Sequence, residues 1–303
     1  MILMLDNRDK EMILAIDLGG TKVQAALFHQ DEMTWSVTEK TASHTLSALI
    51  EQLQQTIVQA GAQLIEGKKI AAIAIGVPGP VANNVMHGSA PLGTQDDIDF
   101  TRHIRAMGLV GEVPIIVKND LQMAGYSEMF RGYGREYQNF CLVSLSTGIG
   151  VAPVLNGQLL EGKLELGHQV LAPDLSPALP CTNHANCWVA LASGSGIAAR
   201  FGKPGATSTE EIFATVLSDD DIGQLRRYNA QGFGTIVNAY DPAAIIIMGS
   251  LGLQQFDKII PDAKELAAFT TNRPLPVFLK TKQHADIGIW GAYYVAKEAL
   301  RSF

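Results

Sequence analysis

The chain has 303 residues, 47% of them hydrophobic and 17% charged, which allows two domains that each have a core of their own. A formal net charge of -7 argues against nucleic acid or an anionic membrane as the main partner, because both require a basic face. The apolar residues 1–5 are followed at once by charged residues, and the longest uncharged stretches are broken by Gly, Pro and Asn. We therefore expect neither a signal peptide nor a membrane anchor, and a cytoplasmic protein.

The first predicted elements form a hairpin around DLGGTK at residues 17–22. Apolar runs on both sides of this segment predict two strands, and its two adjacent glycines predict a tight turn between them. Backbone N–H groups, the Thr21 hydroxyl and the Lys22 ammonium are donors suited to a phosphate, and Asp17 at the strand end is placed to meet a hydrated cation. A plain hairpin turn would explain the glycines but not the polar residues around them, so phosphate binding is favoured.

Strands then alternate with helices, which is typical of an α/β fold. The patterns predict strands over 33–40, 70–77 and 113–117, a helix after Ser43 with apolar positions at 46, 50, 53 and 57, and a helix that ends near Phe130. The strand over 113–117 runs into Asn119 and Asp120, and polar residues at the carboxyl end of a core strand commonly bind ligands. The alternative is that these two residues cap the next helix, and the two roles are compatible.

The second half opens with a similar strand, turn and strand over residues 140–155, with the turn sequence STGIG. Two such turns suggest a duplicated unit with a phosphate held between the copies. Further on, we predict helices over 189–201, 219–239, 253–269 and 287–300, and strands over 243–248 and 277–280. In a two-domain architecture the last helix can return to the first domain.

Common nucleotide-binding and hydrolase motifs, such as G-x-x-x-x-G-K-[ST], G-x-G-x-x-G and G-x-S-x-G, are missing from the sequence. An ordered series occurs instead: DLGGTK at 17–22, GVPGPV at 76–81, ND at 119–120, STGIG at 146–150, ELGH at 165–168, a cysteine segment at 181–187 and a strand followed by glycine at 245–249. In its order and spacing this series resembles the ROK family, and in particular the glucokinase-like sugar kinases of the actin/hexokinase superfamily.

The resemblance implies an α/β fold with two ribonuclease H-like domains, of the actin/hexokinase type, around a central cleft. It places residues 11–119 and 287–303 in a small N-terminal domain with a returning C-terminal helix, and residues 120–286 in a large domain. It also implies a homodimer that binds a small-molecule sugar, ATP and Mg²⁺.

Site roles also follow from the resemblance. The ATP-binding residues would be Gly19, Gly20, Thr21, Lys22, Thr147, Gly148 and Gly249, and Asp17 would face Mg²⁺. Asn119, Asp120, Glu165 and His168 would hold the sugar, and Asp120 would also accept the proton of the attacking hydroxyl. Phosphoryl transfer mainly requires positioning, a metal ion and a carboxylate near the nucleophile, so these residue types suit the chemistry.

A structural zinc site is the second implication, with His168, Cys181, His184 and Cys187 as ligands. The family pattern combines the histidine of E-x-G-H with three cysteines in C-x-C-x4-C, whereas this chain reads C-x2-H-x2-C. Two sulfurs and two imidazoles can still close a tetrahedral zinc site. The alternative is two free thiols and a surface histidine in a polar loop. Cys141, the third cysteine, lies in an apolar run and is expected in the core.

Two departures from the family pattern concern the sugar. The segment from Gly162 to Glu165 is about four residues shorter, and Val189 stands where the family carries a sugar-binding glutamate. The alternative is that Glu161 or Glu165 supplies the missing carboxylate.

The expected function is an ATP-dependent kinase that phosphorylates a primary hydroxyl of a hexose or hexose derivative, like glucokinase. A non-catalytic or weakly catalytic sugar-binding sensor is the alternative, motivated by Val189 and the short loop. A transcriptional regulator is disfavoured, because only sixteen residues precede Asp17 and the chain is acidic.

Overall fold

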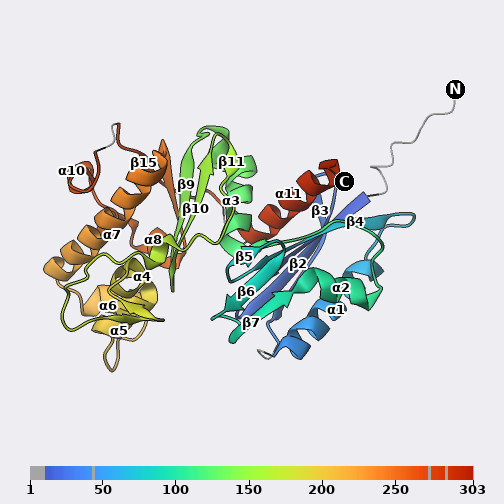
Figure 1. Ribbon diagram of the computed structural model, residues 1–303, viewed down its shortest axis with the longest axis horizontal. Helices are drawn as coiled ribbons and strands as arrows, with labels where there is room; N and C mark the ends of the chain where they lie inside the picture. Colours follow the sequence, from blue (N-terminus) through green and yellow to red (C-terminus); the bar gives the residue numbers. More distant parts are fainter. Residues whose placement is uncertain (1–10, 43–44, 272–273, 284–285, 303) are drawn as a thin grey trace. The chain divides into compact units, whose positions relative to one another are not determined.

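The structure is a computed structural model that describes residues 11–42, 45–271, 274–283 and 286–302 (Figure 1). Residues 1–5 and Ser43, which carried expectations above, lie outside the described residues. The chain divides into two compact units. Unit 1 takes the described residues of Met1–Arg131, Glu161–Lys163 and Gln283–Phe303, and unit 2 takes those of Gly132–Leu160 and Leu164–Lys282. The boundary expected after residue 119 thus falls within unit 1, and the C-terminal helix also belongs to this unit.

Unit 1 is built on a five-stranded sheet with the order β3-β2-β1-β4-β8. Its strands are β1 (Glu11–Leu18), β2 (Lys22–His29), β3 (Glu32–Lys40), β4 (Lys69–Val77) and β8 (Ile115–Asn119). The first three are antiparallel, and β1, β4 and β8 are parallel. The predicted strands are confirmed. The last one begins two residues late, after Pro114, because proline has no N–H for the ladder.

Helices cover both faces of this sheet. They are α1 (Leu46–Ala62) and α2 (Phe100–Met107) on one face, and α3 (Asp120–Arg131) and α11 (Ile287–Ser302) on the other (Figure 1). Side chains alternate along β1, so that Leu14 and Ile16 enter the first core whereas Ile13 and Ala15 enter the second. Because helices cover both faces of the sheet, its central strands carry apolar residues on both faces.

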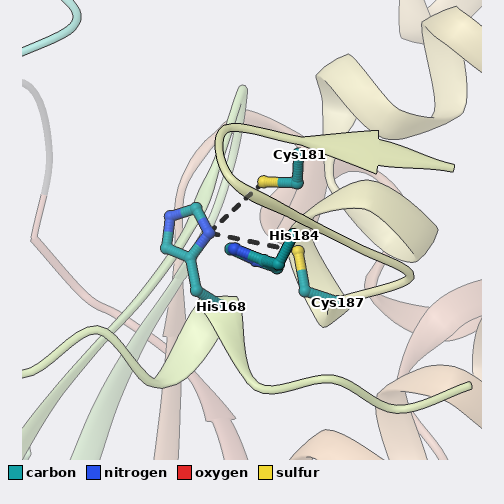
Figure 2. A group of neighbouring side chains, drawn as sticks. All are labelled: His168, Cys181, His184 and Cys187. Carbon is teal, nitrogen blue, oxygen red and sulfur yellow. Dashed lines mark hydrogen bonds between the residues drawn. The ribbon is translucent and has the colours of Figure 1, made fainter. Parts of the chain in front are cut away.

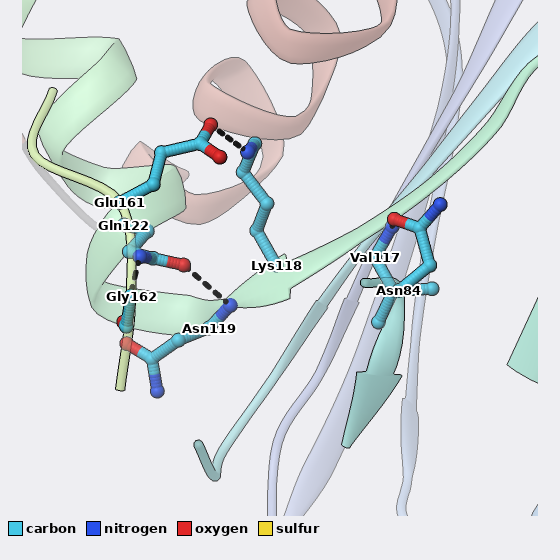
Figure 3. Close-up of polar contacts among 7 residues, drawn as sticks. All are labelled: Asn84, Val117, Lys118, Asn119, Gln122, Glu161 and Gly162. Carbon is cyan, nitrogen blue, oxygen red and sulfur yellow. Dashed lines mark hydrogen bonds and ion pairs between the residues drawn. The ribbon is translucent and has the colours of Figure 1, made fainter. Parts of the chain in front are cut away.

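A small three-stranded sheet in unit 1 was not predicted. It consists of β5 (Val81–Ala82), β6 (Val85–Ser89) and β7 (Thr94–Asp99), and the acidic sequence of β7 lacks the apolar alternation of a strand. Asn84, in the turn after β5, donates from Nδ2 to the Ile115 carbonyl at 3.4 Å. Its Oδ1 atom accepts the Val117 N–H at 2.9 Å (Figure 3). This side chain therefore covers part of the edge of β8 in place of a further strand.

Unit 2 repeats the topology of unit 1, with the strand order β11-β10-β9-β14-β15. The strands are β9 (Phe140–Leu145), β10 (Ile149–Leu155), β11 (Gln158–Leu159), β14 (Ala244–Met248) and β15 (Val277–Lys280). Here too the first three strands in chain order are antiparallel and the next two run parallel to the first. The prediction of a duplicated α/β unit is confirmed.

The helices of unit 2 differ in part from the prediction. They are α4 (Trp188–Ala192), α5 (Gly194–Phe201), α6 (Thr209–Thr215), α7 (Asp219–Tyr240), α8 (Ser250–Gln254), α9 (Phe256–Ile259) and α10 (Ala263–Ala267). The single helix expected over 189–201 is divided at Ser193, whose hydroxyl accepts the Gly196 N–H and caps α5. The helix expected over 253–269 is wrong, because Pro261 keeps Ile260 extended and Asp262 caps a new helix.

Among the described residues, no helix has the length and apolar character needed to cross a membrane.

Candidate functional site

The β1–β2 turn is held by packing on both sides. The Gly19 N–H donates to the Lys22 carbonyl at 2.9 Å, and the Thr41 hydroxyl donates to the Gly19 carbonyl at 2.6 Å. A Cβ atom at position 20 would stand 2.7 Å from the Pro91 carbonyl oxygen, so this close approach requires glycine. Thr21 and Lys22 are exposed, which leaves their side chains accessible to a ligand.

The Asp17 carboxylate lies in a niche formed by two glycines. A Cβ atom at Gly288 would stand 2.5 Å from Oδ2, and one at Gly76 would stand 3.5 Å from Oδ1. Burial raises the pKa of Asp17, and the positive charge of Lys22 lowers it in part. Gly288 is the second residue of α11, and a helix start favours a negative charge. Sequence reasoning missed Gly288, although two glycines three residues apart in an apolar helix signal close packing.

Asn119 and Asp120 end β8 and begin α3, as the sequence predicted. Asn119 donates from Nδ2 to the Gly79 carbonyl at 3.1 Å, and its Oδ1 accepts the Leu121 N–H at 2.9 Å. The same N–H lies 2.8 Å from Oδ1 of Asp120, which is exposed. Both side chains thus contact the helix start, as the capping alternative proposed, and Asp120 is also open to a ligand.

Gly76 connects the two carboxylates of unit 1. It is the β4 partner of Asp17, and its Cβ position lies 3.5 Å from the Asp17 Oδ1 atom and 3.8 Å from the Asp120 Cα atom. Asp17 and Asp120, which are far apart in sequence, therefore flank one glycine at the carboxyl ends of parallel strands, where α/β sheets bind ligands.

The β9–β10 turn of unit 2 is fastened to the start of α5. The Gly194 N–H donates to the Ser146 carbonyl at 2.7 Å, and Ser195 donates to the Thr147 carbonyl from its N–H at 3.1 Å and from its hydroxyl at 2.8 Å. The helix start places its positive end beside this turn, which suits an anionic ligand.

Gly249 lies beside the same turn. Its φ is +86°, and a Cβ atom there would stand 2.4 Å from the Leu145 carbonyl oxygen, so only glycine fits. The preceding residue, Met248, pairs with Ser144 of β9. The predicted nucleotide residues Thr147, Gly148 and Gly249 thus lie on neighbouring strand ends of unit 2.

The predicted metal ligands gather in unit 2 (Figure 2). One ligand atom from each of His168, Cys181, His184 and Cys187 lies within 4.8 Å of the others. The His168 Nδ1 atom is 3.3 Å from the Cys181 sulfur and 4.0 Å from the Cys187 sulfur. The buried His184 Nε2 atom has no hydrogen-bond partner among the described residues, whereas its Nδ1 atom contacts the Asn183 Oδ1 at 3.1 Å.

Local structure explains how these four side chains meet. Cys181 pairs with His184 in the hairpin of β12 (Pro180–Cys181) and β13 (His184–Ala185), and His168 ends a short 3₁₀ turn. Cys187 caps α4, and its sulfur accepts the Ala190 N–H at 3.4 Å, which fixes the sulfur at the start of this helix.

The protonation chemistry of the cluster also suits a metal ion. Burial and His184 lower the pKa of His168, which keeps its imidazole neutral and able to ligate. Burial and the Cys187 thiol raise the pKa of Cys181 to about 11, so a bound cation would be needed to hold this thiolate at neutral pH. Two sulfurs and two imidazole nitrogens fit a tetrahedral zinc ion.

The predicted sugar residues Glu165 and His168 share one turn, in which the His168 N–H donates to the Glu165 carbonyl at 3.0 Å. Partial burial raises the pKa of the Glu165 carboxyl. The turn is packed tightly, because a Cβ atom at Gly167 would stand 2.0 Å from the Ile149 carbonyl oxygen and 3.2 Å from Val189 Cγ2. Val189 thus contacts the turn that carries Glu165 and His168.

A model of the ROK family matches residues 13–299. The chain belongs to the ROK family. It is 29% identical over 300 residues to an N-acetylmannosamine kinase of Escherichia fergusonii, covering 94% of this chain and 98% of that one. It is 23% identical over 322 residues to a glucokinase of Streptomyces coelicolor, covering 95% of this chain and 98% of that one.

Solved ROK structures share the fold. A ROK family glucokinase from Streptomyces griseus, in complex with glucose and AMPPNP, gives a TM-score of 0.71 at 19% identity and covers 95% of this chain and 99% of that chain. A ROK family transcriptional regulator, a homologue of the E. coli MLC protein, gives a TM-score of 0.76 at 22% identity, with 97% and 79% covered. The predicted family and fold class are confirmed.

The burial of Asp17 in this ROK protein predicts a pH-dependent cost in stability. The wild-type protein should lose stability as the pH rises from 3.8, the ordinary pKa, through the raised pKa of the folded state, because the folded state binds more protons in that interval. In buffer without metal ions or nucleotide, Asp17→Asn should therefore raise the thermal midpoint at pH 7.5, and its advantage should shrink on acidification through the same interval.

Asp31 provides a control of opposite sign in the same unit. Hydrogen bonds from Lys297 and Tyr293 lower the pKa of Asp31, so Asp31→Asn should reduce the thermal midpoint at pH 7.5. A lower midpoint for Asp17→Asn at neutral pH would contradict the predicted cost of burying this carboxylate.

Proposed function

We propose that this ROK protein is a kinase that transfers the γ-phosphoryl group of MgATP to a primary hydroxyl of a hexose or hexose derivative. The observation that carries this proposal is the pair of carboxylates in unit 1: a partly buried Asp17 and an exposed Asp120 on either side of Gly76. Phosphoryl transfer needs a carboxylate that holds a metal ion and another that orients the nucleophile. Relatives that are glucokinases and N-acetylmannosamine kinases support the proposal.

The chain's own groups then have distinct tasks. Bound Mg²⁺ would neutralise the phosphate charge of ATP, with Asp17 as the residue that holds it. In unit 1, Gly19, Gly20, Thr21 and Lys22 would donate to phosphate oxygens. In unit 2, Thr147 and Gly148 would do the same, and the missing side chain at Gly249 would leave room for adenosine.

Asp120 would receive the proton of the attacking hydroxyl. The Leu121 N–H holds Oδ1 of this carboxylate and so fixes its orientation. Asn119, Glu165 and His168 would hold the sugar hydroxyls around it.

Replacement of Asp120 tests the proposal directly. In a coupled assay of ADP release with glucose, mannose and N-acetylated hexosamines, Asp120→Asn should lower kcat by roughly 10²- to 10⁴-fold, the range for a lost general acid–base group. Asp99→Asn is the matched control, because Asp99 caps α2 in the same unit and asparagine also caps helices. Near wild-type turnover by the Asp120→Asn variant would show that Asp120 is not the catalytic proton acceptor.

A sugar-binding protein without turnover is the second candidate. The ROK transcriptional regulator of similar fold and the apolar residue at position 189 favour it. Calorimetric binding of a sugar by a wild-type protein that releases no ADP with any sugar would select this candidate. The expected homodimer and the cytoplasmic location stay predictions.

We also infer that His168, Cys181, His184 and Cys187 bind one structural Zn²⁺ per chain. The imidazole of His168 presents Nδ1 to the sulfurs, so a metal ion would fix the turn that also carries Glu165 (Figure 2). Metal binding to such a site contributes directly to folding free energy.

Elemental analysis and thermal unfolding test the zinc site. Cys187→Ser should lose most of the bound zinc and lower the thermal midpoint, because it removes one of four ligands. Cys141→Ser serves as the control for metal content, because Cys141 lies buried in β9 outside the cluster. Much less than one zinc per wild-type chain after metal-replete preparation would mean that the thiols are free.

Val189 is the proposed determinant of sugar specificity. Valine offers no hydrogen bond where a sugar hydroxyl would meet a glutamate, and each buried polar group left unsatisfied costs about 1 to 3 kcal/mol. Glu161 is one of the two side chains that could replace the missing carboxylate, but it forms an ion pair with Lys118 in unit 1. A sugar with an apolar group at this edge, such as the methyl of an N-acetyl group, should bind with less loss than glucose.

Calorimetric titration checks this prediction. Glucose should bind about ten- to a hundredfold more weakly than to a ROK kinase with the full pattern. Val189→Glu should tighten glucose binding more than N-acetylhexosamine binding. Val277→Glu, which adds the same side chain at an exposed position of β15 in unit 2, should change neither affinity. Low-micromolar glucose binding by the wild type, unimproved in Val189→Glu, would rule Val189 out.

A further inference from the structure

A three-residue arm, Glu161–Lys163, belongs to unit 1, whereas the chain on both sides of it belongs to unit 2. Gly162 in this arm has a φ of +131°, which favours glycine, and nothing lies within 4 Å of its Cβ position. Glycine at position 162 is therefore favoured by the backbone conformation of the arm, and not by a neighbour that a side chain would meet.

The arm contacts the segment that carries Asn119 and Asp120 at two points (Figure 3). The Lys118 ammonium forms an ion pair with the Glu161 carboxylate; the Lys118 side chain is 14% exposed and that of Glu161 is 63% exposed. Beyond Asp120, the Gln122 side chain donates from Nε2 to the Gly162 carbonyl at 3.4 Å. The two contacts lie on either side of the Asn119–Asp120 pair.

Gln122 also bonds to the pair itself, because its Oε1 atom accepts the Asn119 N–H at 3.2 Å. One amide side chain thus joins the backbone before Asp120 to the arm. At the other contact, the low exposure of Lys118 makes its ammonium dependent on a nearby acid, because a charge removed from water needs a partner. An exposed catalytic side chain at a helix start needs neighbours that hold its backbone in place, because a small displacement of a reacting group lowers the rate of the reaction.

We propose that Lys118 and Gln122 are positioning residues for Asp120, and that the Glu161–Lys163 arm is the brace through which they act. This inference rests on the proposed kinase function. Lys118 and Gln122 do not touch the reacting atoms; they fix the backbone from which Asp120 projects.

The decisive experiment is a double-mutant cycle. Lys118→Met should lower kcat by about ten- to a hundredfold, with a smaller change in the KM for ATP. Lys118→Arg, which keeps the charge, should retain most of the kcat. Lys69→Met, which removes an exposed lysine at the start of β4 in the same unit, should behave as wild type. In the Asp120→Asn background, Lys118→Met should cause no further loss, because the side chain through which it acts is already gone.

Equal fractional losses of kcat in the wild-type and Asp120→Asn backgrounds would overturn the inference, since they would indicate a general loss of structure. Hydrogen–deuterium exchange separates this outcome from a failure of the kinase proposal. In Lys118→Met, the amides of Asn119 and Leu121 should exchange faster than in wild type, whether or not any sugar is phosphorylated. A wild-type protein without kinase activity overturns the proposed function, and unchanged exchange in Lys118→Met overturns the brace.

Discussion

The close packing of α11 on the sheet of unit 1 is the constraint on which the arrangement of this unit depends. A Cβ atom at Gly291 would stand 1.7 Å from the Met123 carbonyl oxygen. Any residue other than glycine at position 291 would therefore prevent α11 from approaching α3 so closely. Three residues earlier, Gly288 makes room for the Asp17 carboxylate. One helix from the end of the chain thus sets both the helix that begins at Asp120 and the surroundings of Asp17. The cost is the burial of a carboxylate, which natural proteins accept mainly where function requires it.

The duplicated topology gives each unit a hairpin turn between its first two strands and a glycine just after its fourth, Gly79 in unit 1 and Gly249 in unit 2. In unit 1, the strand ends carry the carboxylates Asp17 and Asp120. In unit 2, the corresponding edge carries glycine, serine and threonine, and its turn is fastened to the start of α5. Carboxylates suit a metal ion and a hydroxyl proton, whereas backbone N–H groups and a helix start suit phosphate, so the strand ends of the two units differ in their chemistry.

The Cys/His cluster shares a turn with Glu165. His168 presents Nδ1 to two sulfurs, and its backbone N–H bonds to Glu165, so the position of the metal ligand and that of the carboxylate are linked. The replacement of a cysteine by His184 keeps four donors within 4.8 Å of one another. Val189, two residues beyond Cys187, contacts the same turn at Gly167. This short segment therefore contacts both the Cys/His cluster and the turn that carries Glu165.

The sequence by itself determined the parts of the molecule that depend on local pattern. Apolar runs predicted the strands of both main sheets except the short β11, the two glycine turns marked the repeat, and the spacing of Cys181, His184 and Cys187 indicated a ligand cluster. Only the tertiary structure decided which distant residues meet: Gly288 against Asp17, Gly76 between the two carboxylates, and Glu161 against Lys118. It also divided the helices at Ser193 and Pro261 and formed the polar sheet of β5 to β7. Local periodicity records which face of an element is buried, but close approach and ion pairing depend on atoms from segments that the chain brings together only on folding.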